Sequence, residues 1–276
     1  MEQVLAPPLT PSTTVLFRDG LGERRRVTDP TGKEAVDLWY VSSELGGAAL
    51  EAGLRDRLSR LAGFRHAGVN HVHSVDRVNN GATLAVISDA APGARLSELL
   101  AAAEKHRLPL DISTALCVIR QFVPAIAALY EHDHVIGHGA LAPERLVITS
   151  RAQLVVVDHA MGAALEHLRY SHQRYWKDLR VALPRSAGLP HFDHRVDVMQ
   201  IGVVALSLIL GRLLKDDEYP AKVPELVGSA WAISAAGDLE PLPPGLRAWL
   251  SRAFGRCSRE LGRQNRACLQ KRRDNA

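Results

Sequence analysis

The chain has 276 residues, which is long enough for one large domain or for two lobes with a substantial core. Hydrophobic residues make up 46% of the sequence and charged residues 23%, which excludes the apolar-poor composition of a disordered chain. The formal net charge is +4, and the positive excess gathers near the C-terminus, so the composition does not indicate a broadly basic surface.

Three features of the sequence bear on its compartment. Residues 1–14 lack the basic start and apolar stretch of a secretory signal, and we interpret them as a flexible N-terminal arm. The longest apolar run, Ile201 to Gly211, is about half of the ~20 residues that a membrane span requires. The cysteines, Cys117, Cys257 and Cys268, have no metal-ligand spacing and indicate no disulfide framework. We therefore predict a cytoplasmic protein with no membrane span.

Residues 15–88 predict a small, sheet-rich lobe. Short apolar stretches alternate there with turn residues such as Asp19-Gly20, a pattern typical of antiparallel strands joined by tight turns. Leucines at helical spacing predict one helix over residues 47–62. Two further strands are expected around residues 71–75 and 83–88.

Residues 89–95 contain a proline and a glycine, and we place the hinge between two lobes there. The following lobe, residues 96–255, is dominated by helical patterns. The elements expected in it are helices over 96–105, 112–131 and 197–210 and short strands over 145–149 and 154–158. Together the two lobes predict an α+β, bilobal fold with a ligand cleft between the lobes.

The basic tail, residues 256–276, lacks aromatic residues between its basic ones and has no strong amphipathic face. We therefore predict no nucleic-acid partner and no membrane contact for it. Three interpretations stay open: a solvated helix end, a linker to further sequence, or the last part of the fold.

Several motifs follow one another in a fixed order. The sequence "HGALAPERLVIT" at residues 138–149 resembles the protein kinase catalytic loop H-R-D-L-K-P-E-N, and "VVVDHA" at 155–160 resembles the strand that leads into the metal-binding D-F-G. Residues 84–100 resemble the kinase hinge, and residues 183–212 resemble the A-P-E segment and the buried helix after it. The chain thus resembles the protein kinase-like family, of the bacterial Ser/Thr kinase type, which implies a bilobal kinase-like fold.

The resemblance also implies that the catalytic positions have been replaced. The catalytic-loop aspartate falls at Ala140, its lysine at Ala142 and its metal-binding asparagine at Arg145. Neither alanine can accept a proton or hold a phosphate, and Arg145 is a permanent cation where a metal ion would bind. The strand lysine that grips the nucleotide phosphates falls at Asp37, and its partner glutamate on the helix falls at Arg57.

Asp37 and Arg57 allow two interpretations. They form the family's ion pair with its signs exchanged, or both are exposed surface charges, whose pairing would be weak. The phosphate-covering loop keeps only Gly20 and Gly22 and is followed by the basic run at residues 24–26. This run attracts an anion, forms a solvated face or guards a sheet edge against pairing.

Other positions keep the family's residue type. By the resemblance, Asp158 stands at the metal-binding aspartate and Ala35 at the small residue over the adenine. His138 and Asp197 are structural in the family, and His159 replaces a phenylalanine in the stack of side chains that links the lobes.

We therefore expect a pseudokinase, a degenerate member that serves as a scaffold or allosteric regulator. Its expected partner is a protein, such as an active kinase or another signalling protein. No cofactor is expected, although weak binding of ATP or Mg²⁺ stays open. The alternative is a nucleotide-binding enzyme with residual or non-standard phosphoryl or nucleotidyl transfer through Asp158. A second acidic ligand beside Asp158 would favour the enzyme, but the loop supplies Arg145 instead.

Overall fold

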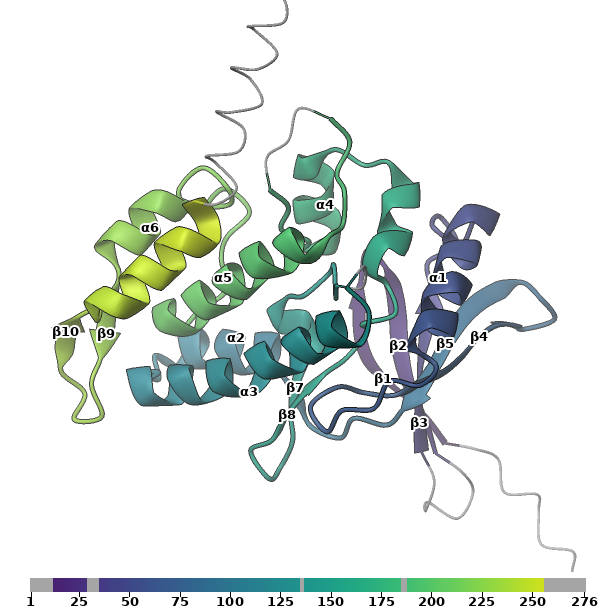
Figure 1. The fold of residues 1–276 in the computed structure, drawn as a ribbon. Coiled ribbons are helices and arrows are strands. Elements are labelled where there is room, and N and C mark those ends of the chain that lie inside the picture. The colour runs from purple at the N-terminus through teal and green to yellow at the C-terminus, as the bar shows by residue number, and fades with distance from the viewer. Residues whose placement is uncertain (1–11, 29–34, 135–136, 185–187, 256–276) are drawn as a thin grey trace, which may run out of the picture.

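The computed structural model describes residues 12–28, 35–134, 137–184 and 188–255. The tail at 256–276 and residues 1–11 of the arm lie outside the described residues, so the interpretations of those segments stay predictions. The first strand begins at Ser12, inside the segment interpreted as an arm. The chain folds into a sheet-rich N-lobe and a larger helical C-lobe, as the sequence predicts (Figure 1).

The N-lobe is an antiparallel sheet with the strand order β1-β2-β3-β5-β4. Its strands are β1 (Ser12–Asp19), β2 (Gly22–Thr28), β3 (Ala35–Val41), β4 (Val72–Val78) and β5 (Thr83–Asp89). The turn between β1 and β2 needs a glycine at position 22. Gly22 has φ +129°, and a Cβ there would collide with the carbonyl oxygen of Tyr40.

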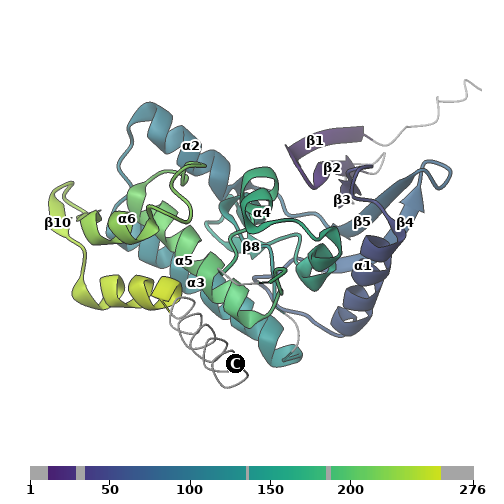
Figure 2. The same ribbon diagram turned by 90° about the horizontal axis from the view of Figure 1, so that it is seen from above.

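One helix, α1 (Ala48–Leu61), packs on this sheet and faces the C-lobe (Figures 1 and 2). Three of its leucines, Leu50, Leu54 and Leu61, are buried, which confirms the helical spacing seen in the sequence. Arg57 is buried on the same helix, so α1 carries a cation into the interior between the lobes.

The C-lobe is built from helices around a small three-stranded sheet. The strands are β6 (Ala94–Arg95), β7 (Leu146–Ile148) and β8 (Leu154–Val156). Its helices are α2 (Leu96–His106), α3 (Ile112–His132), α4 (His172–Leu179), α5 (His194–Leu210) and α6 (Val223–Ser229). A hairpin of β9 (Trp231–Ile233) and β10 (Leu239–Pro241) and a helix over 244–255 complete the described lobe.

Helices α3 and α5 form the centre of the C-lobe and lie side by side in both views (Figures 1 and 2). Helix α5 is buried on nearly every side, as its uniformly apolar sequence predicts. Within the described ranges, α3 alone is long and apolar enough to cross a membrane. Its Phe122, Ala125 and Leu129 are fully buried in the main core, so in this fold α3 serves as a core helix.

Short backbone pairings and helical turns hold the lobes against each other. The segment after α1 pairs with β8: the N–H of Asn70 donates to the carbonyl of Val156 at 2.8 Å, and the N–H of Val156 donates to Gly68 at 2.9 Å. The 3₁₀ segment η2 (Gly162–Leu168) packs against α1. The C-lobe therefore fixes the position of α1 as well as that of the sheet.

Replacing Phe122 by alanine tests the assignment of the core. Because Phe122 is completely buried, we expect Phe122→Ala to lower the free energy of unfolding by about 3–5 kcal/mol, through lost burial and the cavity left behind. Chemical denaturation measures the change. Leu99→Ala, at an exposed position on α2, is the control and should cost less than about 1 kcal/mol. Equal losses in the two variants would contradict the placement of α3 in the core.

Candidate functional site

The cleft between the lobes contains a cavity of about 190 Å³. Most pockets that hold drug-sized ligands have a volume of about 300–1,000 Å³, so this cavity is small. Charged side chains lining it include Arg24, Asp37, Arg95 and Asp158. Ala35, predicted to lie over an adenine, begins β3 and is not among the lining residues of the cavity.

The loop that resembles the catalytic loop is packed as core. Ala140 and Ala142 are buried, and Ala140 belongs to the apolar cluster that also contains Phe192. The short 3₁₀ segment η1 (Pro143–Arg145) follows the alanines and buries Arg145. At the two alanine positions there is accordingly no group that could accept a proton or hold a phosphate.

The guanidinium of Arg145 hydrogen-bonds to backbone carbonyls and so fixes the loop in place. Its Nη1 donates to the carbonyl of Ala140 at 3.0 Å, and its Nη2 donates to the carbonyl of Leu179 at 2.9 Å. The same Nη2 lies 3.1 Å from Oδ2 of Asp19, a residue at the end of β1. Arg145 therefore ties its own loop to the N-lobe, and its guanidinium fills the place where the resemblance would put a metal ligand.

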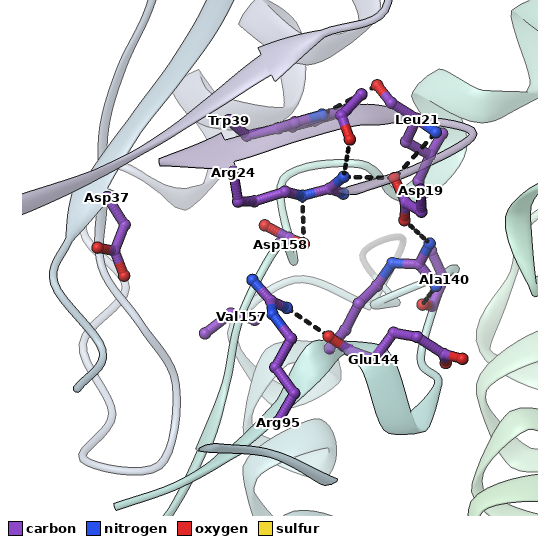
Figure 3. A network of polar contacts seen from close by, with 12 residues as sticks. Asp19, Leu21, Arg24, Asp37, Trp39, Arg95, Ala140, Glu144, Val157 and Asp158 are labelled. Atoms are coloured by element: carbon purple, nitrogen blue, oxygen red, sulfur yellow. Dashed lines mark hydrogen bonds and ion pairs between the residues drawn. The ribbon is translucent and has the colours of Figure 1, made fainter. Parts of the chain in front are cut away.

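Asp158 is an ionised carboxylate held by arginines (Figure 3). It lies just after β8 with φ +60°, and its side chain is 11% exposed. Its Oδ2 accepts a hydrogen bond from Nε of Arg24 at 3.1 Å. Burial alone would raise the pKa of Asp158, but the charges of Arg24, Arg95 and Arg145 outweigh burial and leave the pKa below its ordinary value. Asp158 is therefore an anion at neutral pH.

Arg24 reaches Asp158 from β2 of the other lobe. It is only 2% exposed, and its guanidinium lies over the ring of Trp39, 5.0 Å from the ring centroid. Its Nη1 donates to Oδ1 of Asp19 and to the carbonyl of Gly22. Figure 3 shows the contact of Arg24 with Asp19. Since Arg145 binds the other oxygen of this carboxylate, Asp19 lies between two buried guanidinium groups.

The two interpretations of Asp37 and Arg57 are both wrong. In the part of the chain that the structure describes, no ion pair joins them. The register of β2 and β3 puts Arg26 directly opposite Asp37, and Arg26 makes a bidentate pair with it, Nε to Oδ1 at 2.7 Å and Nη2 to Oδ2 at 2.8 Å. The carboxylate of Asp37 is therefore paired within the N-lobe sheet and not with Arg57 on α1.

Arg57 is also not an exposed surface charge. Its Nε donates to the carbonyl of His159 at 2.8 Å, and its Nη2 donates to the carbonyl of Gly137. Burial lowers the pKa of Arg57 to about 10, although the nearby charge of Asp197 opposes the shift. A protonated Arg57 therefore ties α1 to the backbone of two separate segments of the C-lobe.

His138, Asp197 and Gln200 hold the loop from inside the C-lobe. The two oxygens of Asp197 accept the N–H groups of His138 and Gly139, each at 2.7 Å. The Nε2 of His138 contacts the carbonyl of Val157 at 3.0 Å. Gln200 accepts the N–H of Leu141 at 2.6 Å and donates to Gly139 at 2.8 Å. These contacts satisfy buried backbone groups of the loop.

The sequence interpretation missed Asp19, Arg95 and Gln200. In the sequence, Asp19 is recognisable only as a turn residue and Arg95 only as part of the hinge segment. The spacing of Gln200 from Asp197, three residues along one helix, indicates a shared helix face and is the available signal. No local pattern identifies the ionic contacts of Asp19, because their partners lie on other elements.

Comparison with known proteins identifies the fold. No protein-family model matches the chain. The kinase domain of Mycobacterium tuberculosis PknI is similar, with a TM-score of 0.60 and 19% identity over 91% of each chain. The kinase domain of maize SIRK1 (sucrose-induced receptor kinase 1) bound to AMP-PNP has a TM-score of 0.61 and 17% identity, covering 92% of this chain and 89% of that one. The chain thus has a bilobal protein-kinase-like fold.

The Arg26–Asp37 pair can be tested by exchanging its charges. Arg26→Asp and Asp37→Arg each place like charges on facing strand positions, so each should lower the free energy of unfolding. The double exchange rebuilds an ion pair, and we expect it to recover about 0.5–3 kcal/mol relative to the sum of the single losses. Combining Asp37→Arg with Arg55→Asp on α1 is the control and should be additive. Additivity in the first pair as well would contradict the contact.

His159 gives the protein a pH dependence. Burial lowers the pKa of His159 to about 3, with further lowering from His138 and Arg57, and its Nδ1 has no hydrogen-bond partner among the described residues. An unfolded histidine titrates near pH 6.5, so between about pH 6.5 and 3 the unfolded chain binds a proton that the folded chain does not. Stability is therefore lost as the pH falls through this window, by up to about 1.4 kcal/mol per pH unit for this residue.

Replacing His159 by phenylalanine removes that titration. Between pH 6.5 and 4.5 we expect His159→Phe to lose about 2 kcal/mol less unfolding free energy than the unmodified protein, measured by denaturation at each pH. His106→Phe, at an exposed position in α2, controls for the replacement of any histidine by phenylalanine. Parallel stability curves for His159→Phe and the unmodified protein would show that His159 is not held neutral.

Proposed function

We propose that this chain is a pseudokinase. On this proposal, the domain keeps the protein-kinase-like fold, does not transfer phosphoryl groups, and acts as a protein-interaction scaffold or an allosteric regulator. The observation that carries the proposal is the ion pair between Asp158 and Arg24, in which a buried cation lies 3.1 Å from the carboxylate oxygen at the metal position.

The charge balance around Asp158 disfavours Mg²⁺. Protein-bound Mg²⁺ takes carboxylate and water oxygens in an octahedral arrangement and usually bridges to substrate phosphates. Here Arg24 occupies Oδ2 of Asp158, and the guanidinium of Arg145 stands where a second ligand would be expected. Among the described residues, no group of three histidine, cysteine or acidic side chains is placed to hold a metal ion.

The other positions that the resemblance assigns to phosphoryl transfer make structural contacts in this chain. Asp37 is paired with Arg26, Arg57 is bound to backbone carbonyls, and Ala140 and Ala142 are buried in the core. Phosphoryl transfer depends on cations that grip the phosphates and on a group that orients the attacking hydroxyl. With these positions committed elsewhere, several simultaneous changes would be needed to restore the chemistry.

A protein partner follows from the same reasoning. A domain that has the fold but lacks the catalytic groups can still act by binding other molecules at its surface. We propose an active kinase or another signalling protein as the partner, a cytoplasmic setting, and no required cofactor.

The alternative function is an enzyme that uses Asp158 in non-standard phosphoryl or nucleotidyl transfer. One observation favours it: Asp158 is ionised and lines the cavity, so it could receive a metal ion if Arg24 moved away. Such a movement would break the contacts of Arg24 with both Asp158 and Asp19, and removing one partner of a buried ion pair costs about 3–5 kcal/mol.

A transfer assay decides between the two functions. We expect no label to pass from γ-labelled or α-labelled ATP to the protein itself or to a generic acceptor protein, with Mg²⁺ or Mn²⁺ present. An active protein kinase is the positive control. Ala140→Asp should stay inactive, since the positions at Ala142 and Arg145 are still changed. Transfer of label by the unmodified protein that is abolished in Asp158→Asn would establish the enzyme instead, and the labelled phosphate would identify the reaction.

A further inference from the structure

The cleft holds an unbalanced cluster of buried charges. Three arginines, Arg24, Arg95 and Arg145, meet two aspartates, Asp19 and Asp158, and all of these side chains are largely buried. Asp19 and Arg24 belong to the N-lobe, and Arg95 and Asp158 belong to the C-lobe (Figure 3). Burying charge without compensation is costly, so the excess cation needs an explanation.

The excess positive charge of this cluster lies on Arg95. Arg24 contacts both aspartates and Arg145 contacts Asp19, whereas no carboxylate of the described chain pairs with the guanidinium of Arg95. The only hydrogen bond from its guanidinium to a described group runs from Nη1 to the backbone carbonyl of Glu144. The carboxylate of Glu144 lies away from Arg95 in Figure 3. Arg95 is nevertheless only 7% exposed, and its guanidinium lies 4.6 Å from the centroid of the Phe17 ring.

Arg24 adds an unsatisfied donor. Its Nη2 is buried and has no hydrogen-bond partner among the described residues, and Arg24 as a whole is only 2% exposed. Arg24 and Arg95 both line the cavity of about 190 Å³ in the cleft. A buried guanidinium donor without an acceptor is a strong site for an oxyanion, because charge-assisted hydrogen bonds to phosphate or carboxylate oxygens are short and strong.

The other charged groups facing the cavity are Asp37, Arg26, Asp158 and Glu98. Asp37 is neutralised by Arg26, and Asp158 by Arg24. Glu98 is exposed at the rim, where solvent screens it, and its Oε2 accepts the backbone N–H of Arg95 at 2.9 Å. Glu98 therefore opposes an anion only weakly and does not cancel the charge of the Arg95 side chain.

We propose that this cavity binds a small oxyanion of the phosphate class directly through Arg95 and Arg24, without a metal ion. The guanidinium of Arg95 supplies a planar set of donors that matches phosphate oxygens, and the bound group offsets the excess cation. In metal-bridged nucleotide binding, a carboxylate attracts the metal ion that holds the phosphate. In the proposed mode there is no metal ion, so the carboxylate of Asp158 repels the anion and the arginines attract it. The inference goes beyond the proposed function and holds whatever the protein partner is.

A thermal-shift titration with inorganic phosphate tests the site. With EDTA present, we expect phosphate to raise the melting temperature in a saturable way, and KCl at the same ionic strength to give no saturable rise. Further arms with ATP in EDTA and with adenosine alone identify the source of the phosphate group. Tighter binding of ATP indicates a nucleotide, and equal or weaker binding of ATP indicates a small free phosphate compound; both support an anion site.

Three variants make the test specific. We expect Arg95→Gln to weaken phosphate binding about tenfold or more, since it removes the uncompensated cation. Glu98→Gln should tighten phosphate binding because it removes the rim carboxylate, and it still offers an oxygen to the N–H of Arg95. Arg55→Gln, an exposed position on α1 outside the cavity, should leave binding unchanged. Each variant is first checked for a cooperative unfolding transition in the absence of phosphate.

The contrary results are equally distinct. No saturable shift with phosphate, the same shift with KCl, or unchanged phosphate affinity in Arg95→Gln would overturn the proposal. A shift that appears only when Mg²⁺ is added would also overturn it and would indicate a metal-bridged ligand. The transfer assay is independent of these results, so an inactive protein without phosphate binding would retain the proposed function and refute only the anion site.

Discussion

The shared contact of Asp19 with Arg24 and Arg145 is the constraint on which the rest of the cleft depends. It joins the first hairpin of the N-lobe to the loop and to the Asp158 segment of the C-lobe. Because these charges are buried, each one needs the others: a missing partner would leave an unpaired ion in a low-dielectric interior. The network therefore holds the two lobes close together, and this closeness keeps the cavity between them small.

A second buried arginine, Arg57, joins α1 to the C-lobe. Its guanidinium reaches two backbone carbonyls, of His159 and Gly137, that belong to separate segments of the C-lobe. Gly162 leaves room for this guanidinium, since a Cβ at that position would collide with it. The position of α1 is thus held by hydrogen bonds from an arginine to backbone carbonyls of the C-lobe.

Much of the fold follows from local sequence patterns. Leucine spacing predicts α1, and the uniformly apolar run predicts a central α5. Both predictions are possible because the spacing of apolar residues over a few helical turns determines which helix face is buried. The motif order also predicts the order of the loop, β7, β8 and Asp158 along the chain. Fold comparisons confirm this architecture at 16–20% identity.

The ionic partners could not be predicted in the same way. The resemblance allows Asp37 either to pair with Arg57 or to be an exposed charge, but the strand register places Arg26 opposite Asp37 as its partner. Arg24 was noted only as part of a basic run, and its contacts with Asp19 and Asp158 depend on tertiary packing. Long side chains can reach several carboxylates, so only the packed structure decides between them.

The double tie of Arg57 has a consequence for recognition. In kinase-like folds, movement of α1 relative to the C-lobe is a common source of alternative shapes. A helix fastened to two backbone carbonyls has little freedom to rotate away, so the surface formed by α1 and η2 is presented in one arrangement. A partner that docks there would meet a preorganised surface and lose little conformational entropy in ordering it, which favours tight binding from a modest contact area.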